Sequence, residues 1–252
     1  MAPDEPITLH TPLGFRSSFA FPLQSGRARR EVLIGAALLL IPLVGWLLNM
    51  GHRVMMVHRM LHGEPAWPSW RDYGELLRHG LVTFGGMLFY YAPGLALLAA
   101  AWRTDAPALA AAGGLLLVLA TLAIPGYMTH YCRAFDAAEI FNPARALGRA
   151  LQGGAAYWHA WAIALAALAL SFAGLLALGI GFLVTSVWFW QVAGFSFARV
   201  FSQRYLGVAP VAPGRLSSRS RLAEACERLD AAEERALAEE GSARDVEAWP
   251  EY

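Results

Sequence analysis

The chain has 252 residues, of which 57% are hydrophobic and only 15% are charged, whereas soluble domains contain about 25% charged residues on average. The apolar residues form long runs between a polar N-terminal segment and a polar C-terminal tail, which excludes an ordinary soluble domain and favours a membrane protein. The two cysteines, Cys132 and Cys226, match no metal-binding spacing and exclude a disulfide framework.

The formal net charge of +1 hides an asymmetry along the chain. Residues 1–214 contain 14 arginines and 9 acidic residues, whereas residues 215–252 contain 6 arginines and 10 acidic residues. We expect three parts: a polar cytoplasmic N-terminal segment (1–30), a membrane domain (31–206) and an acidic cytoplasmic tail (207–252). Membrane lipids are the expected surroundings, and no nucleic-acid partner is expected.

Five apolar runs reach the length of about 20 residues that a helix needs to cross a bilayer core about 30 Å thick. The sequence therefore predicts an all-α, polytopic transmembrane helical bundle. The last four runs are expected to form two tandem helical hairpins. In chain order, the five runs cover residues 31–50, 81–102, 107–128, 155–177 and 180–201.

The placement of arginine orients these runs, because cytoplasmic loops are enriched in basic residues. The segment 51–80 carries four arginines and the segment 133–154 carries three, so both are expected in the cytoplasm. The short turns within the two hairpins carry little or no charge and should face the periplasm. The pattern predicts a multi-pass protein of a bacterial inner membrane with a cytoplasmic C-terminus.

The first run conflicts with this orientation. Three arginines at positions 27, 29 and 30 place the N-terminus inside, although one crossing by residues 31–50 would place it outside. Pro42 and Gly45 lie at the middle of the run, where proline removes a backbone donor and clashes with the preceding turn. We therefore expect a broken or re-entrant first segment, with a full crossing and an external N-terminus as the alternative.

An interfacial amphipathic helix is expected before each hairpin. In the first, Ser69 would cap the helix with Asp72 three residues later, and Gly80 would close it. In the second, Asn142 would cap the helix and Pro143 would occupy its first position, where a missing donor is harmless.

The acidic tail contains a weakly periodic stretch. Residues 217–240 are rich in Ala, Glu and Arg, and Leu222 and Leu229 stand seven residues apart. This spacing is typical of a short helix with a thin apolar seam. The helix is expected to be solvated and frayed, or to bind a protein partner, and the last residues are expected to be disordered.

Few side chains suggest chemistry. His58 and His62 share the spacing that a metal can bridge, but an interfacial histidine pair explains them without metal. Trp188, Trp190 and Gln191 form a cluster that could line a ligand site or could simply pack. We predict no catalytic residues, no metal site and no cofactor.

The segment from Gly51 to Leu81 resembles a family of prokaryotic polytopic membrane proteins catalogued as domain of unknown function four-zero-one-three. In that family a glycine and an aromatic residue open a basic helix, but here His52 follows Gly51. The resemblance covers residues 15–206 and implies a helical membrane fold without an established activity. The residues that match the family's pattern are Gly63, Glu64, Pro68, Trp70, Asp72, Gly74 and Gly80.

These observations favour a non-enzymatic membrane scaffold or accessory subunit that docks through its interfacial helices and tail. The first alternative is a transporter or channel for a small or lipid-like solute, which predicts a cavity near Pro42 that reaches Gln191. The second alternative is a lipid-modifying membrane enzyme. It would have to use the one dense cytoplasmic group of candidate side chains, namely His58, His62, Glu64 and Asp72.

Overall fold

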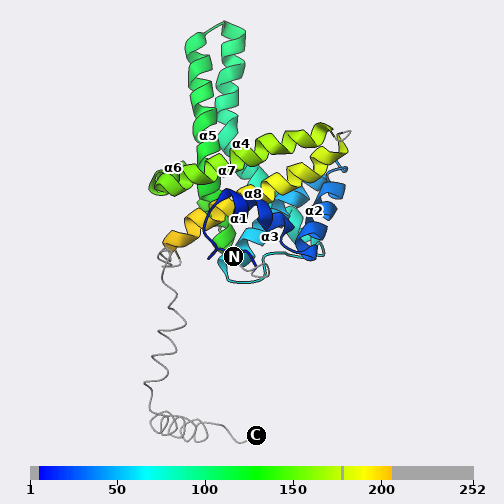
Figure 1. Ribbon diagram of the computed structural model, residues 1–252. Coiled ribbons are helices and arrows are strands. Elements are labelled where there is room, and N and C mark those ends of the chain that lie inside the picture. The colour runs from blue at the N-terminus through cyan, green and yellow to red at the C-terminus, as the bar shows by residue number, and fades with distance from the viewer. Residues whose placement is uncertain (1–5, 177–178, 206–252) are drawn as a thin grey trace, which may run out of the picture. The chain divides into compact units, whose positions relative to one another are not determined.

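The computed structural model describes residues 6–176 and 179–205, with side chains as far as residue 202, and all regular structure within these ranges is helical. The chain divides into two units, residues 1–207 and 208–252. The second unit, and with it the expected tail helix at 217–240, lies outside the described residues. Figure 1 shows the arrangement of the helices in the first unit.

The chain begins with three short elements that precede the first long helix. These are α1 (Phe15–Ala20), the 3-10 turn η1 (Phe21–Leu23) and α2 (Gly26–Leu38). Ser25 caps α2, since its hydroxyl accepts a hydrogen bond from the Ala28 amide at 3.1 Å. Such a cap satisfies one of the amide donors that the start of a helix leaves free.

The first apolar run is interrupted in its middle. α2 ends at Leu38, and α3 (Val44–Leu61) begins after a turn that contains Pro42 and a left-handed Leu43 with φ of 59°. The side-chain amide of Asn49 bridges the interruption, because it donates to the Gly35 carbonyl at 3.0 Å and to the Gly45 carbonyl at 2.8 Å. The run thus forms two helices joined by an elbow, which we define as residues 39–43.

The segment after α3 differs from the expectation. We expected a short helix capped by Ser69 and closed by Gly80, but residues 62–72 form turns and α4 runs without interruption from Tyr73 to Thr104. Asp72 takes the position before its first turn, and Gly80 lies within it. A single glycine costs a helix only about 1 kcal/mol, and close packing against α3 offsets that cost.

α4 pairs with α5 (Pro107–Ala134) through a very short connection in which Asp105 adopts a left-handed conformation. After the 3-10 turn η2 (Ala137–Glu139) comes the helix α6 (Pro143–Gln152). Asn142 caps α6 by accepting from the Arg145 amide at 3.0 Å. The second expected cap is therefore present.

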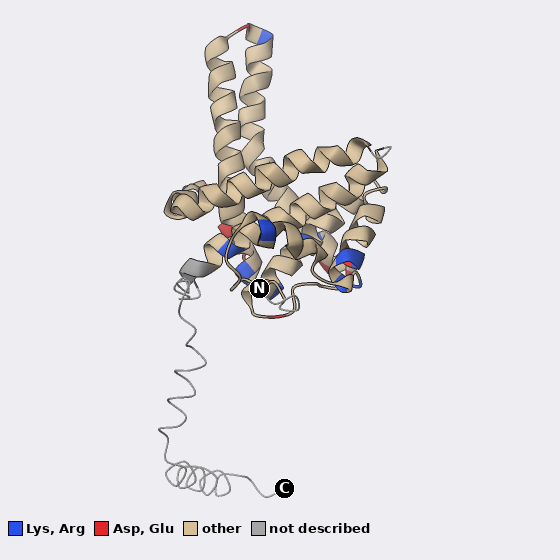
Figure 2. Cartoon of the chain, in the orientation of Figure 1, with Lys and Arg blue, Asp and Glu red and all other residues tan. Residues whose placement is uncertain are grey.

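The remaining elements are α7 (Gly154–Ala173), the 3-10 turn η3 (Gly174–Leu176) and α8 (Ile180–Tyr205). α7 and α8 pack against each other, as α4 and α5 do. In the view of Figure 1 the α7–α8 pair runs across the α4–α5 pair at a steep angle. Figure 2 shows that both pairs carry charged residues only near their ends.

Four helices in the described part of the chain are long and apolar enough to cross a membrane: α4, α5, α7 with η3, and α8. We expected five apolar runs of this kind. The first run falls short because the elbow divides it into two shorter helices, neither of which meets the length and hydropathy of a span. The chain has the helical make-up of a multi-pass membrane protein.

The N-terminal segment, residues 7–24, packs along α8. Phe21 is fully buried, with its ring stacked on Trp67 at 5.1 Å and on Phe195 at 4.6 Å between centroids. The Trp188 indole donates to the Phe19 carbonyl at 3.2 Å. Hydrogen bonds from Ser196 to Ser18 and from Arg199 to Thr11 extend this contact.

Candidate ligand-binding cavity

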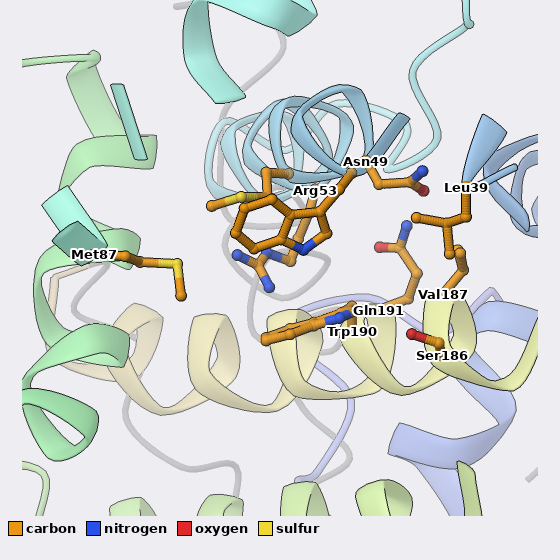
Figure 3. A pocket seen from close by; sticks show the side chains of 10 residues that line it. Leu39, Asn49, Arg53, Met87, Ser186, Val187, Trp190 and Gln191 are labelled. Atoms are coloured by element: carbon orange, nitrogen blue, oxygen red, sulfur yellow. The ribbon is translucent and has the colours of Figure 1, made fainter. Parts of the chain in front are cut away.

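A cavity of about 90 Å³ lies beside the elbow, between α3 and α8 (Figure 3). Leu39 forms its wall at the elbow, and α8 contributes Ser186, Trp190 and Gln191. We call it the elbow cavity. It occupies the region near Pro42 in which a solute-binding protein was expected to have a cavity, and it reaches Gln191 as that interpretation required.

Arg53 projects from α3 into this space. Its guanidinium carbon lies 4.6 Å from the centre of the Trp190 ring, a cation–π contact. Among the residues that the structure describes, Arg53 makes neither a hydrogen bond nor an ion pair. Burial lowers the pKa of its guanidinium below the ordinary value, yet an arginine stays protonated in a protein. The cavity therefore holds a cation whose described surroundings supply no anion.

Gln191 is the second unsatisfied polar group of the elbow cavity. Its side chain is only 2% exposed, and its Oε1 atom has no hydrogen-bond partner in the described part of the chain. Figure 3 shows the amides of Asn49 and Gln191 approaching each other from α3 and α8. Because a buried polar atom without a partner costs about 1–3 kcal/mol, this arrangement suits a bound polar group.

A larger cavity of about 250 Å³ adjoins the elbow cavity and shares Arg53, Met87 and Trp190 with it. We call it the apolar cavity, because side chains of α3, α4, α5, α7 and α8 make its lining almost entirely apolar. Gly194 belongs to this lining, and a Cβ atom there would lie 3.3 Å from Cγ of Arg53. Glycine thus leaves room for the arginine stem to cross α8.

Polar side chains in the apolar cavity are few, and two of them bond to each other. Tyr91 and Thr121 share a hydrogen bond of 2.8 Å between their hydroxyls, and Thr121 also donates to the Leu117 carbonyl. The two cavities together therefore present one cation at their junction, a polar end beside the elbow and a long apolar remainder. This distribution matches a molecule with an anionic head and an apolar body.

Comparison with known proteins gives the chain a family but no activity. The model of the family described as Protein of unknown function (DUF4013) matches residues 34–228, which is more than half of the chain. The chain belongs to this family. No curated protein matches the chain, and no solved structure matches it either. The DUF4013 match begins later than the resemblance at residue 15 predicted, and it extends beyond residue 206 into the acidic tail.

The DUF4013 motif residues lie in the loop between α3 and α4 and at the start of α4. Gly63 has a φ of 72°, which other residues rarely adopt, and Glu64 pairs with Arg59 at 3.1 Å. Asp72 precedes the first turn of α4, and Gly80 packs against the backbone of Leu47. The motif therefore fixes the crossing of α3 and α4.

Trp70 joins this motif to α2. Its ring stacks on His52, with centroids 4.0 Å apart and planes 8° apart, and its indole donates to the Glu31 carbonyl at 3.3 Å. His52 is fully buried and lies 3.0 Å from the Glu31 carboxylate. The histidine that replaces the usual DUF4013 aromatic residue thus stacks as an aromatic would, while Glu31 partners its ring nitrogen.

The ring nitrogens of the two candidate histidines, His58 and His62, contact backbone carbonyl oxygens of the protein. The rings of His58 and His62 lie 4.2 Å apart, but Nδ1 of His58 contacts the Cys132 carbonyl at 2.7 Å and Nδ1 of His62 contacts the His58 carbonyl at 2.8 Å. No group of three metal-ligating side chains occurs within the described ranges. Within the described residues, no hydrogen bond or ion pair joins these histidines to Glu64 or Asp72, and Glu64 is paired with Arg59.

Sequence reasoning identified part of the cavity and missed its centre. Trp190 and Gln191 line the elbow cavity, whereas Trp188 of the same cluster bonds to the N-terminal segment instead. Arg53 was counted only as a loop arginine that orients the membrane domain. Its position on α3, two residues after the motif glycine Gly51, was the one available signal that it could point into the bundle.

Proposed function

We propose that this membrane protein binds an amphipathic anion, such as a single-chain fatty acid, and that it does so without chemical conversion. The carboxylate would lie at Arg53 and the chain would lie in the apolar cavity. The single observation that carries the proposal is the Arg53 guanidinium, which has no anionic partner in the described part of the chain and lies at the junction of a polar and an apolar space.

The charge of Arg53 is the reason to expect an anion in this space. Arg53 is half-buried, so water screens its charge only in part, and an anion beside its guanidinium would gain from that incomplete screening. Charge-assisted hydrogen bonds to a carboxylate are about twice as strong as neutral ones. The amides of Asn49 and Gln191 stand near enough to Arg53 to line the same space (Figure 3).

The lining also supports binding over catalysis. The described residues that line the two cavities include neither a histidine nor a carboxylate, the groups that most often transfer protons in enzymes. Of the two non-enzymatic functions, the cavities favour solute binding. The scaffold interpretation depends on the interfacial helices and on the acidic tail, and the tail lies outside the described residues.

For the topology, we propose that the α4–α5 pair crosses the membrane and brings Arg103 and Asp105 to the periplasmic face. The apolar windows of these helices are 22% and 17% buried inside the protein, against 33% and 44% for α7 and α8. Outward apolar surface of this extent suits lipid. Because α7 and α8 run across this pair steeply, only one pair can stand along the membrane normal in this arrangement (Figure 1).

The finer arrangement follows from the same reasoning. We propose that the elbow turns the chain back, so that α2 and α3 do not cross the bilayer and the N-terminus stays in the cytoplasm. The amphipathic α6 would lie at the inner leaflet. A cysteine that replaces the exposed Arg16 should escape an impermeant reagent in intact cells, and one that replaces Asp105 should react. Reaction at position 16 would contradict the elbow topology.

The binding proposal is tested with the full chain in a non-ionic detergent. Dodecanoate is titrated below its micelle concentration and followed by calorimetry. Arg53→Gln should weaken binding at least about tenfold, since hydrogen bonds to charged groups contribute about 1.5–3 kcal/mol. Arg71→Gln, an exposed arginine outside both cavities, is the matched control. Equal affinities for the two variants would refute the proposal.

A further inference from the structure

A plain fatty acid would leave one buried acceptor of the elbow cavity without a partner. Gln191 is 2% exposed, and its Oε1 atom makes no hydrogen bond with a described residue. A carboxylate accepts hydrogen bonds but donates none. A carboxylate at Arg53 would therefore pair the guanidinium, while Oε1 of Gln191 would remain buried without a donor.

Asn49, whose amide faces Gln191 across the elbow cavity, does not supply this donor. An asparagine side chain carries two N–H groups. The amide nitrogen of Asn49 already donates to the Gly35 carbonyl at 3.0 Å and to the Gly45 carbonyl at 2.8 Å. Both hydrogens are thus engaged with the backbone on the two sides of the elbow. The same two bonds hold the Asn49 amide in place, so this wall of the cavity is fixed.

The two other polar neighbours of Gln191 leave its Oε1 unpaired as well. The Arg53 guanidinium lies over the Trp190 ring, and the proposed function assigns its N–H groups to the carboxylate of the ligand. Ser186 precedes Gln191 by five residues on α8 and adds a hydroxyl to the lining, but this hydroxyl does not donate to Oε1 of Gln191. The donor that Gln191 lacks must therefore come from the ligand.

The position of the Gln191 amide says where that donor has to lie. Figure 3 shows the side chain rising from α8 towards α3, with its oxygen on the side of Arg53 and its nitrogen towards Asn49. A group that donates to this oxygen is thus adjacent to an anion at Arg53. The elbow cavity of about 90 Å³ is small, so only the head of the ligand fits there and the chain continues into the apolar cavity.

We infer that the ligand is a hydroxylated fatty acid, whose hydroxyl on carbon 2 or 3 donates to Oε1 of Gln191 while its carboxylate binds Arg53. This rests on the proposed function, because it uses the same site, and it narrows the ligand class. A site that hydrogen-bonds a hydroxyl discriminates against the analogue without it, since the buried acceptor then loses its partner. Gln191 is thus the residue that determines specificity.

The experiment titrates four probes into the full chain in a non-ionic detergent and measures their affinities by calorimetry. They are dodecanoate and its 2-hydroxy, 3-hydroxy and 12-hydroxy derivatives. The 2-hydroxy or the 3-hydroxy acid should bind about tenfold more tightly than dodecanoate. The 12-hydroxy acid should bind no more tightly than dodecanoate, because its hydroxyl would lie in the apolar cavity, where burial of a polar group is unfavourable.

Variants assign the preference to Gln191. Gln191→Met keeps a side chain of similar length without a strong acceptor, and it should reduce the preference for the hydroxy acid to less than about twofold. Gln191→Leu serves the same purpose if the methionine variant does not fold, as judged by circular dichroism. Arg71→Gln, an exposed arginine outside both cavities, is the control and should keep the preference.

The outcomes separate this inference from the proposed function. If neither the 2-hydroxy nor the 3-hydroxy acid binds the wild-type chain more tightly than dodecanoate, the inference is wrong, whatever the variants do. If the preference survives the loss of the Gln191 amide, the hydroxyl binds elsewhere and Gln191 does not determine specificity. If dodecanoate binding is indifferent to Arg53→Gln, the proposed function fails, even where the hydroxy acids are preferred.

Discussion

Replacing Gly80 with alanine should weaken the crossing of α3 and α4. A Cβ atom at Gly80 would overlap the carbonyl oxygen of Leu47, well inside the 3.0 Å that real Cβ contacts essentially never breach. Because the obstacle is backbone, no side chain can rotate away and the two helices must separate. Overpacking of this kind costs about 1–3 kcal/mol, while the helix propensity of alanine returns about 1 kcal/mol. Relative to the wild-type chain the net loss should be about 0–2 kcal/mol, and relative to a control glycine-to-alanine change that gains only the propensity it should be about 1–3 kcal/mol.

Thermal unfolding of the purified chain in one detergent, followed by circular dichroism, measures this loss. Gly85→Ala is the matched control, because it lies on the same helix and a Cβ atom there meets nothing within 4 Å. The control should keep or slightly raise the unfolding temperature. If Gly80→Ala unfolds at the same temperature as Gly85→Ala or higher, the close crossing inferred from the structure is wrong.

Three further changes probe the elbow, the buried pair and the acidic bridge. Asn49→Ala removes the two hydrogen bonds across the elbow and should lower stability by about 1–3 kcal/mol; an unchanged unfolding temperature would contradict that role. His52→Phe keeps the stacked ring but leaves the Glu31 carboxylate buried without its partner. Stability should fall in denaturant unfolding and recover when Glu31→Gln is added. Glu139→Gln should lower stability near neutral pH, because arginines hold the pKa of that carboxyl below its ordinary value of 4.5. The deficit should shrink as pH falls below about 4.5, where the wild-type carboxyl also takes up its proton, and a deficit independent of pH would argue against the pairing.

The hydropathy of successive residues predicted the four apolar helices and the interruption of the first run at Pro42. Each of these features depends on residues that are close together in the sequence. The Pro42 turn and the Asn142 cap are likewise local features. The short helix ending at Gly80 was wrong for a physical reason. A glycine inside a helix costs only about 1 kcal/mol, and at Gly80 the missing side chain lets the backbone of Leu47 lie directly on α4.

The cavities and the pairing of charges could not be predicted. Arg145 and Arg149 both bind Glu139, six and ten residues away. The elbow cavity combines residues of α3 with residues of α8 that lie more than 130 positions later in the chain. No pattern of neighbouring residues predicts that α3 and α8 lie side by side, because this contact depends on how the helices pack.

The N-terminal segment has a consequence for the order in which the molecule assembles. Ser18 and Thr11 bond to partners on α8 that are 178 and 188 residues away. During synthesis these residues leave the ribosome well before their partners, which emerge only after α1 to α7 have been made. Phe21 must therefore wait for α8 to cover the ring face that stacks on Phe195, whereas Trp67 is available earlier. Contacts of such high sequence separation form late and slowly, so the N-terminal segment should be the last part of the bundle to become protected from proteolysis.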